Sequence, residues 1–223
     1  MKKIVIALSG GLDSTTLLHY LLEQGYELHC CSFYYGSKHG IEETKSAGNI
    51  IEYFKSKKYP VFSYFINLSE VFRGFDSSLL NNKEKIPEGH YQQENMKFTV
   101  VPGRNLIFAS ILAGLAESIG AEHIALGVHA GDHYIYPDCR PNFIYSLNEV
   151  IKQSTENKVS VICPFQDKTK IEIVKIGIDL QTPFLLTRTC YTSNEKACGK
   201  CGSCIERLEA FKLNNIKDPI NYE

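Results

Sequence analysis

The sequence lacks both an excess of positive charge and a long apolar run. It contains 24 lysine and arginine residues against 25 aspartate and glutamate residues, which gives a formal net charge of −1. Binding to long nucleic acids usually needs a positive surface, so this balance favours small-molecule partners and no nucleic acid. No window reaches the roughly 18 uninterrupted apolar residues of a membrane span, so we expect no membrane partner.

The N-terminus also lacks the features of a secretory signal. The stretch MKKIVIAL has two lysines and an apolar run, but it is short and a glycine turn follows it where a small-residue cleavage site would stand. We therefore expect a cytoplasmic protein whose eight cysteines are thiols or metal ligands rather than disulfides. There is no internal repeat or low-complexity tract, and 223 residues with 43% hydrophobic content can bury a core.

Apolar runs alternate with segments of helical spacing along most of the chain. Strands are predicted over residues 2–8, 27–33, 60–68, 123–128 and 159–163, and helices over residues 15–23, 41–54, 106–119, 141–153 and 169–176. Five strands that alternate with helices predict an α/β fold with a doubly wound, mostly parallel sheet. We assign residues 1–181 to this nucleotide-binding domain and residues 182–223 to a C-terminal segment packed on it.

One internal stretch departs from this alternation. Residues 69–97 show no convincing periodicity, and nearly thirty residues without structure are uncommon inside a compact domain. We predict a lid or active-site loop that is partly helical near residues 71–80. A disordered surface insertion is the alternative.

A glycine loop follows the first predicted strand, as SGGLDST at residues 9–15. Ligands of doubly wound sheets bind beyond the carboxyl ends of the strands, which is where this loop must lie. Two glycines allow a close backbone approach, and the next helix offers unpaired N–H groups that suit phosphate. The lysine of a Walker loop and the three spaced glycines of a dinucleotide fingerprint are both absent. The plain alternative is a glycine turn in which Ser14 or Thr15 caps the helix.

Four cysteines crowd into the C-terminal segment at Cys190, Cys198, Cys201 and Cys204. Two-residue gaps that contain glycine let successive sulfur atoms point at one centre. Four thiolates without histidine predict a closed, structural zinc site, and an iron–sulfur cluster is the alternative. The remaining cysteines, Cys30, Cys31, Cys139 and Cys163, fall in predicted strands or loops and carry no metal pattern.

The motif at residues 9–15 resembles the PP-loop of the ATP pyrophosphatases, an adenine nucleotide α-hydrolase-like fold. The further motifs PGRN at 102–105, YPDCR at 136–140, KTKIEIVKIG at 168–177 and the cysteine-rich tail resemble the QueC family, the 7-cyano-7-deazaguanine synthases of queuosine and archaeosine biosynthesis. The resemblance covers nearly the whole chain. It implies a ligase that forms carbon–nitrogen bonds. ATP would adenylate 7-carboxy-7-deazaguanine, ammonia would give the amide, and a second ATP would activate that amide to form the nitrile.

The resemblance also implies roles for individual residues. Asp13, Ser14 and Arg104 would act in catalysis, and Asp132, Asp138 and Arg140 would recognise the substrate. ATP with Mg²⁺ would bind to Leu8, Ser9, Gly10, Gly11, Leu12, Asp13, Ser14, Thr15, Thr16, Arg104 and Asn105. A helix cap is the plain alternative for Asn105. Lys168 and Lys170 would face the substrate carboxylate or remain solvated. The family further implies a homodimer.

Two histidines, His129 and His133, stand four residues apart, but they fall in a loop where that spacing does not indicate a metal. We expect them to contribute pocket polarity beside Asp132. Two other functions remain compatible with the glycine loop. A tRNA-modifying thiolase or lysidine-type ligase would usually bring a basic RNA-binding domain, for which the chain has no spare length or positive excess. A zinc-stabilised nucleotide-binding module without catalysis is the other alternative.

Overall fold

The computed structural model describes residues 1–80, 84–90 and 93–223. Among these residues, five strands form one sheet in the order β3-β2-β1-β4-β5, and every neighbouring pair is parallel. The strands are β1 (Lys2–Ala7), β2 (Tyr26–Tyr34), β3 (Val61–Asn67), β4 (His123–Ala125) and β5 (Ser160–Ile162). The predicted doubly wound α/β fold is therefore confirmed.

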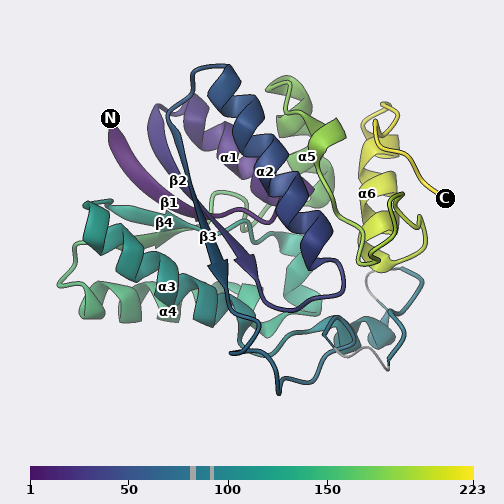
Figure 1. Ribbon diagram of the computed structural model, residues 1–223, viewed down its shortest axis with the longest axis horizontal. Helices are drawn as coiled ribbons and strands as arrows, with labels where there is room; N and C mark the ends of the chain where they lie inside the picture. The colour runs from purple at the N-terminus through teal and green to yellow at the C-terminus, as the bar shows by residue number, and fades with distance from the viewer. Residues whose placement is uncertain (81–83, 91–92) are drawn as a thin grey trace.

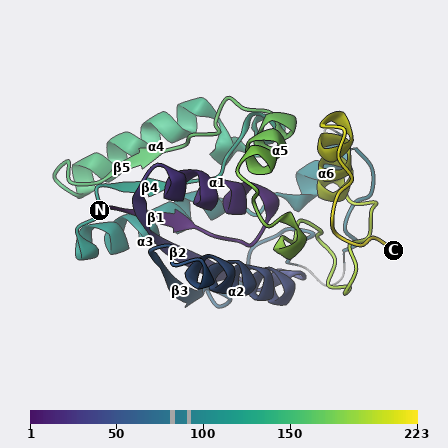
Figure 2. The same ribbon diagram turned by 90° about the horizontal axis from the view of Figure 1, so that it is seen from above.

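Helices cover both faces of the sheet (Figures 1 and 2). α1 (Leu12–Glu23), α2 (Gly40–Ser56) and α5 (Lys170–Asp179) lie on one face, and α3 (Arg104–Ile119) and α4 (Pro141–Ser154) lie on the other. The ten helices and strands predicted from apolar spacing are all present, with bounds that differ by a few residues. Parallel strands need such crossover helices, because the chain must return to the same edge of the sheet.

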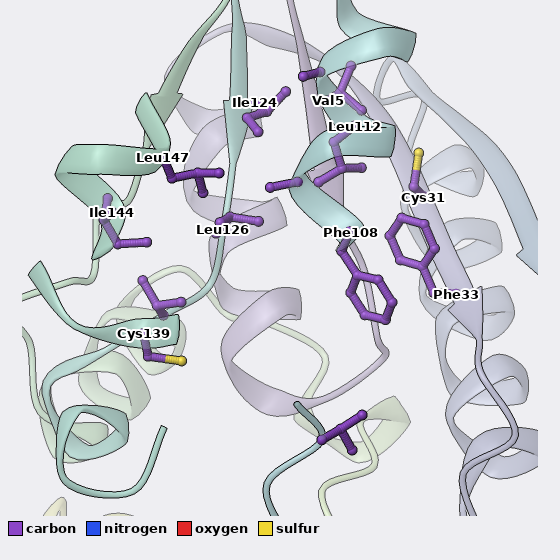
Figure 3. Packing of buried hydrophobic residues seen from close by; sticks show 14 of the residues in the cluster. Val5, Cys31, Phe33, Phe108, Leu112, Ile124, Leu126, Cys139, Ile144 and Leu147 are labelled. Carbon is purple, nitrogen blue, oxygen red and sulfur yellow. The ribbon is translucent and has the colours of Figure 1, made fainter. Parts of the chain in front are cut away.

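Adjacent residues of β1 pack into two separate apolar clusters. Ile4 and Ile6 lie among side chains of α1, α2 and α5, whereas Val5 lies among those of α3 and α4. On the second face, Phe33 of β2 stacks on Phe108 of α3 with ring centroids 4.1 Å apart (Figure 3). Burial on both faces explains why β1 reads as a continuous apolar run instead of an alternating one.

The prediction of helix near residues 71–80 is wrong. The segment forms turns, and its backbone makes hydrogen bonds with other parts of the chain. Lys38 N donates to Leu79 O, and Ser78 N donates to Phe98 O. These non-local partners, together with the burial of Phe72 and Leu79, replace the local bonds of a helix. A short 3₁₀ helix, η1 (Glu94–Thr99), follows instead. Residues 81–83 and 91–92 of the predicted lid lie outside the described residues.

One stretch of the described chain, Glu94–Ile119, is long and apolar enough to cross a membrane by length and composition alone. Core helices of globular proteins meet the same criterion. Its helical part, α3, buries Phe108, Leu112 and Ala116 against the sheet and carries Arg104 in its first turn. These contacts make α3 a core helix of the α/β fold.

The C-terminal segment contains η4 (Phe184–Leu186) and α6 (Gly202–Leu213), which packs beside α5 (Figure 2). Arg207 of α6 is fully buried and forms a two-pronged ion pair with Asp218, at 2.7 and 2.9 Å. Its guanidinium also donates to Thr187 Oγ1, Thr189 Oγ1 and Phe184 O. Every guanidinium N–H group therefore has an acceptor, and one side chain ties α6 to the chain on either side.

We predict that Arg207→Met destabilises the protein strongly, because Asp218 would keep a buried charge without its partner. The expected loss in the free energy of unfolding is about 3–5 kcal/mol, measured by denaturant titration. Arg73→Met is the control, because Arg73 pairs with Glu70 on the surface. That change should cost less than about 1 kcal/mol. Equal stability of the two variants would contradict this account of the C-terminal segment.

Candidate active site

A cavity opens at the carboxyl edge of the sheet, next to the ends of β1 and β4. These strands are neighbours, but the helices that follow them, α1 and α4, lie on opposite faces of the sheet. The loops diverge at such a switch point and leave a crevice, which is the usual ligand site of doubly wound folds. Leu8 and Ser9 line the cavity after β1, and Leu126, Gly127 and Val128 line it after β4.

The glycine loop forms the floor of this cavity. Gly10 has a φ of +81°, a conformation that favours glycine, and a Cβ atom there would lie 2.6 Å from Ala47 N of α2. Gly11 is the N-cap residue of α1, and among the described residues no side-chain hydrogen bond caps the helix. The hydroxyls of Ser14 and Thr15 instead point back to Gly11 O, at 3.3 and 2.7 Å. The first turn of α1 thus offers its N–H groups to an anion.

Not every predicted nucleotide-binding residue faces the cavity. Leu8, Ser9, Gly11, Leu12, Asp13, Ser14, Arg104 and Asn105 line it. Gly10, Thr15 and Thr16 lie behind it, where Gly10 shapes the turn and Thr16 Oγ1 donates to Leu12 O. These three residues act on the loop's geometry instead of contacting the cavity.

An ionic cluster stands over the start of α1. Lys170 Nζ lies 2.6 Å from Asp13 Oδ2 and 3.3 Å from Glu206 Oε2, and His129 Nε2 lies 3.5 Å from Asp132 Oδ2. Burial alone would raise the pKa of Asp13, but the charges of Lys170 and His129 outweigh it and lower that pKa. Burial raises the pKa of Glu206 despite the opposing charge of Lys170. Lys170 is thus a buried member of the cavity, not a solvated surface lysine.

The other wall of the cavity centres on Arg104, at the start of α3. Its guanidinium lies 5.9 Å from the ring centroids of both Tyr35 and Tyr136, and it donates to Tyr35 Oη at 3.4 Å. Burial would lower the pKa of Arg104, but the neighbouring tyrosines and Asp138 raise it, so the group stays charged. A fixed cation of this kind suits a phosphate or carboxylate.

The predicted substrate residues do not all converge on the cavity. Asp132 lines it, whereas Asp138 and Arg140 do not. Asp138 Oδ2 accepts from Asn105 N at 2.9 Å, so this carboxylate caps α3. Arg140 Nε donates to His133 O at 3.0 Å on the exposed side of the same loop. Of the two histidines expected to add polarity to the pocket, only His129 lines the cavity.

Several cavity residues have no motif of their own in the sequence. Tyr35, His39 and Glu43 come from the segment after β2 and the start of α2, and Arg188 and Tyr191 lie on either side of Cys190. Glu206 comes from α6, about 190 residues after the glycine loop. For Tyr35, His39 and Glu43, the only signal in the sequence is that they closely follow a predicted strand. Arg188, Tyr191 and Glu206 follow no predicted strand and carry no such signal.

The four cysteines predicted as ligands form one cluster, with Cys190, Cys201 and Cys204 buried. Their sulfur atoms lie within 4.8 Å of one another. Four thiolates at about 2.3 Å from one ion would be about 3.8 Å apart in a tetrahedron, so the arrangement fits a metal. Backbone N–H groups of Cys198 and Cys201 donate to Cys190 Sγ and Cys198 Sγ, both at 3.3 Å. Such donors stabilise thiolate ligands.

The cysteine cluster and the glycine loop are joined by a short piece of backbone. Arg188 N donates to Gly10 O at 2.8 Å, two residues before Cys190. The Arg188 guanidinium then donates to the carbonyl groups of Thr192, Asn194 and Glu195, in the loop that leads to Cys198. The same residue therefore holds the glycine loop on one side and the cysteine loop on the other.

A family model described as "Queuosine biosynthesis protein QueC" matches residues 3–215. Among curated proteins, the 7-cyano-7-deazaguanine synthase of Pseudoalteromonas atlantica is 43% identical over 223 residues, which is 100% of both chains. The synthase of Psychromonas ingrahamii is 44% identical and covers 100% of this chain and 98% of its own.

Solved structures with low sequence identity share the fold. NMN synthetase from Francisella tularensis superposes with a TM-score of 0.52 at 14% identity, over 96% of this chain and 77% of its own. The U34-tRNA thiolase NcsA from Methanococcus maripaludis, with its [4Fe-4S] cluster, gives 0.51 at 16% identity, over 96% and 65%. At this identity the likeness concerns the fold alone.

We predict that Gly10→Ala damages the loop, because the new Cβ would meet backbone atoms of α2 and the φ would be strained. The expected loss of stability is about 2–5 kcal/mol, with weaker nucleotide binding in any folded fraction. Calorimetric unfolding with and without ATP measures both effects. Gly48→Ala is the control, since nothing lies within 4 Å of its added Cβ and it sits within α2. This control should be neutral or slightly stabilising.

We also predict that metal removal loosens the C-terminal segment, because ligand binding by four thiolates contributes folding free energy. Chelation, or Cys201→Ala, should lower the Tm by about 10 °C or more, measured by calorimetry beside metal analysis. Cys163→Ala is the control, because Cys163 lies outside the cluster. A purified protein without metal and with an unchanged Tm would refute the prediction.

Proposed function

The chain belongs to the QueC family of queuosine biosynthesis proteins, and on that premise we propose that it is the ATP-dependent ligase that makes 7-cyano-7-deazaguanine. Its substrates would be 7-carboxy-7-deazaguanine, ammonia and ATP. The reaction would pass through an adenylated acid, an amide and an adenylated amide. The names of full-length relatives at 39–44% identity support this assignment.

One observation carries the proposal: an uncapped helix N-terminus opens into a cavity at the sheet's switch point, behind a glycine loop. The N–H groups of α1 suit the β and γ phosphates of ATP, which would leave as pyrophosphate. Holding those two phosphates at the loop leaves the α phosphate directed into the cavity. Attack there by a carboxylate or amide oxygen transfers AMP to the substrate.

The charged and aromatic side chains of the cavity fit a site that binds both the triphosphate and a flat substrate. Arg104 and Lys170 both line the cavity and would neutralise charge that develops on the phosphates. Phe33, Tyr35, Phe108 and Tyr136 form an aromatic wall suited to a flat ring such as the deazaguanine. Of the three residues predicted to recognise the substrate, Asp132 faces this space. Asp138 and Arg140 would act through the loop that carries them.

The residues also fit the two metals that the family implies. Asp13 Oδ1 is buried and has no hydrogen-bond partner among the described residues, and Asp13, Asp132 and Glu206 supply the oxygen atoms that Mg²⁺ prefers. Magnesium, when bound, would neutralise triphosphate charge. The four cysteines would hold a structural zinc ion with no open position for chemistry. Metal analysis distinguishes zinc from the iron of an iron–sulfur cluster.

The remaining parts of the proposal concern organisation. We place the nucleotide-binding domain in residues 1–181 and the metal segment, which adds Glu206 to the cavity wall, in residues 182–223, in a cytoplasmic homodimer. Exposed apolar side chains support an association with a second copy: Phe62 and Phe65 on the edge strand β3, and Leu106 on α3. The near-neutral charge supports small-molecule partners over nucleic acid or membrane.

We predict that the purified protein converts 7-carboxy-7-deazaguanine, ammonium and ATP into the nitrile. Mass spectrometry should find two molecules of AMP for each nitrile, and omission of ammonium should abolish the product. AMP formed only when tRNA is added would favour a tRNA-modifying enzyme. No AMP under any condition would favour a non-catalytic nucleotide-binding module.

Asp13→Asn should lower kcat/KM for ATP by about 100-fold or more, because it removes a carboxylate that would bind Mg²⁺ while keeping the shape of the side chain. Asp179→Asn is the control on α5, where Asp179 is exposed and pairs with Lys175 on the surface. Full activity in Asp13→Asn would contradict the placement of the triphosphate.

A further inference from the structure

One carboxyl group in the cavity wall has no part in the scheme above. Glu43 lies in the first turn of α2 and lines the cavity on the side of Arg104 and Arg188, away from Lys170. Its backbone carbonyl lies 2.9 Å from the position that a Cβ on Gly10 would occupy, so the first turn of α2 touches the glycine loop. Glu43 therefore stands close to the phosphate end of the cavity.

The surroundings of Glu43 differ from those of the other cavity carboxyl groups. Asp13 and Glu206 each pair through one carboxylate oxygen with the ammonium group of Lys170. Glu43 has no lysine partner among the described residues, and its carboxylate instead meets Nε2 of His39 at 3.5 Å. Because a strongly paired carboxylate is a weak base, Glu43 is the member of the set best suited to accept a proton.

Three elements face the Glu43 carboxyl group. His39 and Tyr35 come from the segment between β2 and α2, Arg104 comes from α3, and Arg188 comes from the segment before the cysteine cluster. Burial raises the pKa of Glu43 to about 7, although the charges of Arg104 and Arg188 oppose that shift. A carboxyl group with a pKa near neutrality can take up and release protons at the pH of the cell.

His39 remains the neutral neighbour in this pair. It is buried, and burial together with Arg104 lowers its pKa to about 4. A neutral imidazole whose Nε2 faces Glu43 can orient the carboxylate without competing for the proton. His39 acts on Glu43 and is a positioning residue.

We propose that Glu43 is the general base that receives the proton of ammonia when the nitrogen attacks the acyl adenylate. The nitrogen lone pair forms the C–N bond. The bond between the acyl carbon and the oxygen of the α phosphate breaks, and AMP leaves with the electron pair of that bond. One N–H proton of the adduct passes to the Glu43 carboxylate, and the amide remains. The same carboxylate, after it has released that proton, is placed to remove an N–H proton of the adenylated amide as the C–O bond breaks to form the nitrile.

The proposal rests on the proposed function, and its test separates the two. Adenylation is followed without ammonia, as substrate-dependent exchange of labelled pyrophosphate into ATP. Amide and nitrile formation are followed with ammonium by mass spectrometry. Glu43→Gln removes the base and keeps the volume, Glu43→Asp keeps a carboxylate, and Glu52→Gln is the control on the exposed side of α2.

We expect Glu43→Gln to retain exchange within about threefold and to lose amide formation by about 100-fold or more. Glu43→Asp should recover part of the amide rate, and Glu52→Gln should match the unaltered protein in both assays. With hydroxylamine, a weaker base than ammonia, the defect of Glu43→Gln should shrink, because the adduct loses its proton more easily.

The pH dependence gives a readout that a purely structural role would not alter. Glu43 must be ionised to act, so the amide rate per free ammonia should rise with pH through about 7 in the unaltered protein. This inflection should be absent in Glu43→Gln and present in Glu43→Asp.

Three outcomes overturn the assignment of Glu43. They are amide formation at the full rate in Glu43→Gln, an unchanged pH profile in that variant, and an equal loss of exchange and amide formation in Glu43→Gln and Glu43→Asp. The first two leave the proposed function intact. Absence of exchange in the unaltered protein would overturn the proposed function itself.

Discussion

The turn at Gly10 is the constraint on which the site depends. Its positive φ and missing Cβ let the backbone pass between α2 and the segment that carries Arg188. This close contact directs the first turn of α1 into the cavity and at the same time brings α2 against the loop. The first turn of α1, the first turn of α2 with Glu43 and the approach to the cysteine cluster therefore share one point of backbone contact.

Most of the sheet is predictable from the sequence, because strands buried on both faces read as continuous runs of β-branched and other apolar residues. The predicted strand at residues 123–128 ends early, at Ala125, and Leu126, Gly127 and Val128 line the cavity. Helix α6 was not predicted, because it begins inside the cysteine cluster and its buried face includes a charged residue, Arg207, which interrupts the apolar spacing. Tertiary partners decide both of these departures.

The candidate site is predictable only where its residues are local. The glycine loop and the four cysteines each lie within one short segment, so spacing alone brings their groups together. Asp138 was predicted to bind the substrate, but its carboxylate accepts a hydrogen bond from Asn105 N and caps α3 from a distant loop. The sequence around Asp138 gives no sign of this contact. The burial of Lys170 depends on Asp13 and Glu206, which are far away in the sequence and give no local signal.

The C-terminal segment that carries the cysteine cluster forms part of the cavity wall. The Arg188 guanidinium donates hydrogen bonds to three carbonyl groups of the cysteine loop, and the backbone N–H of Arg188 donates to Gly10 O. Arg207 fixes the same segment through hydrogen bonds to Thr187 and Thr189. Because these bonds form a continuous chain from the cysteine loop to the glycine loop, the order of one limits the freedom of the other. The packing around the cysteine cluster can thus help to keep the turn at Gly10 in a conformation that the turn alone would not hold.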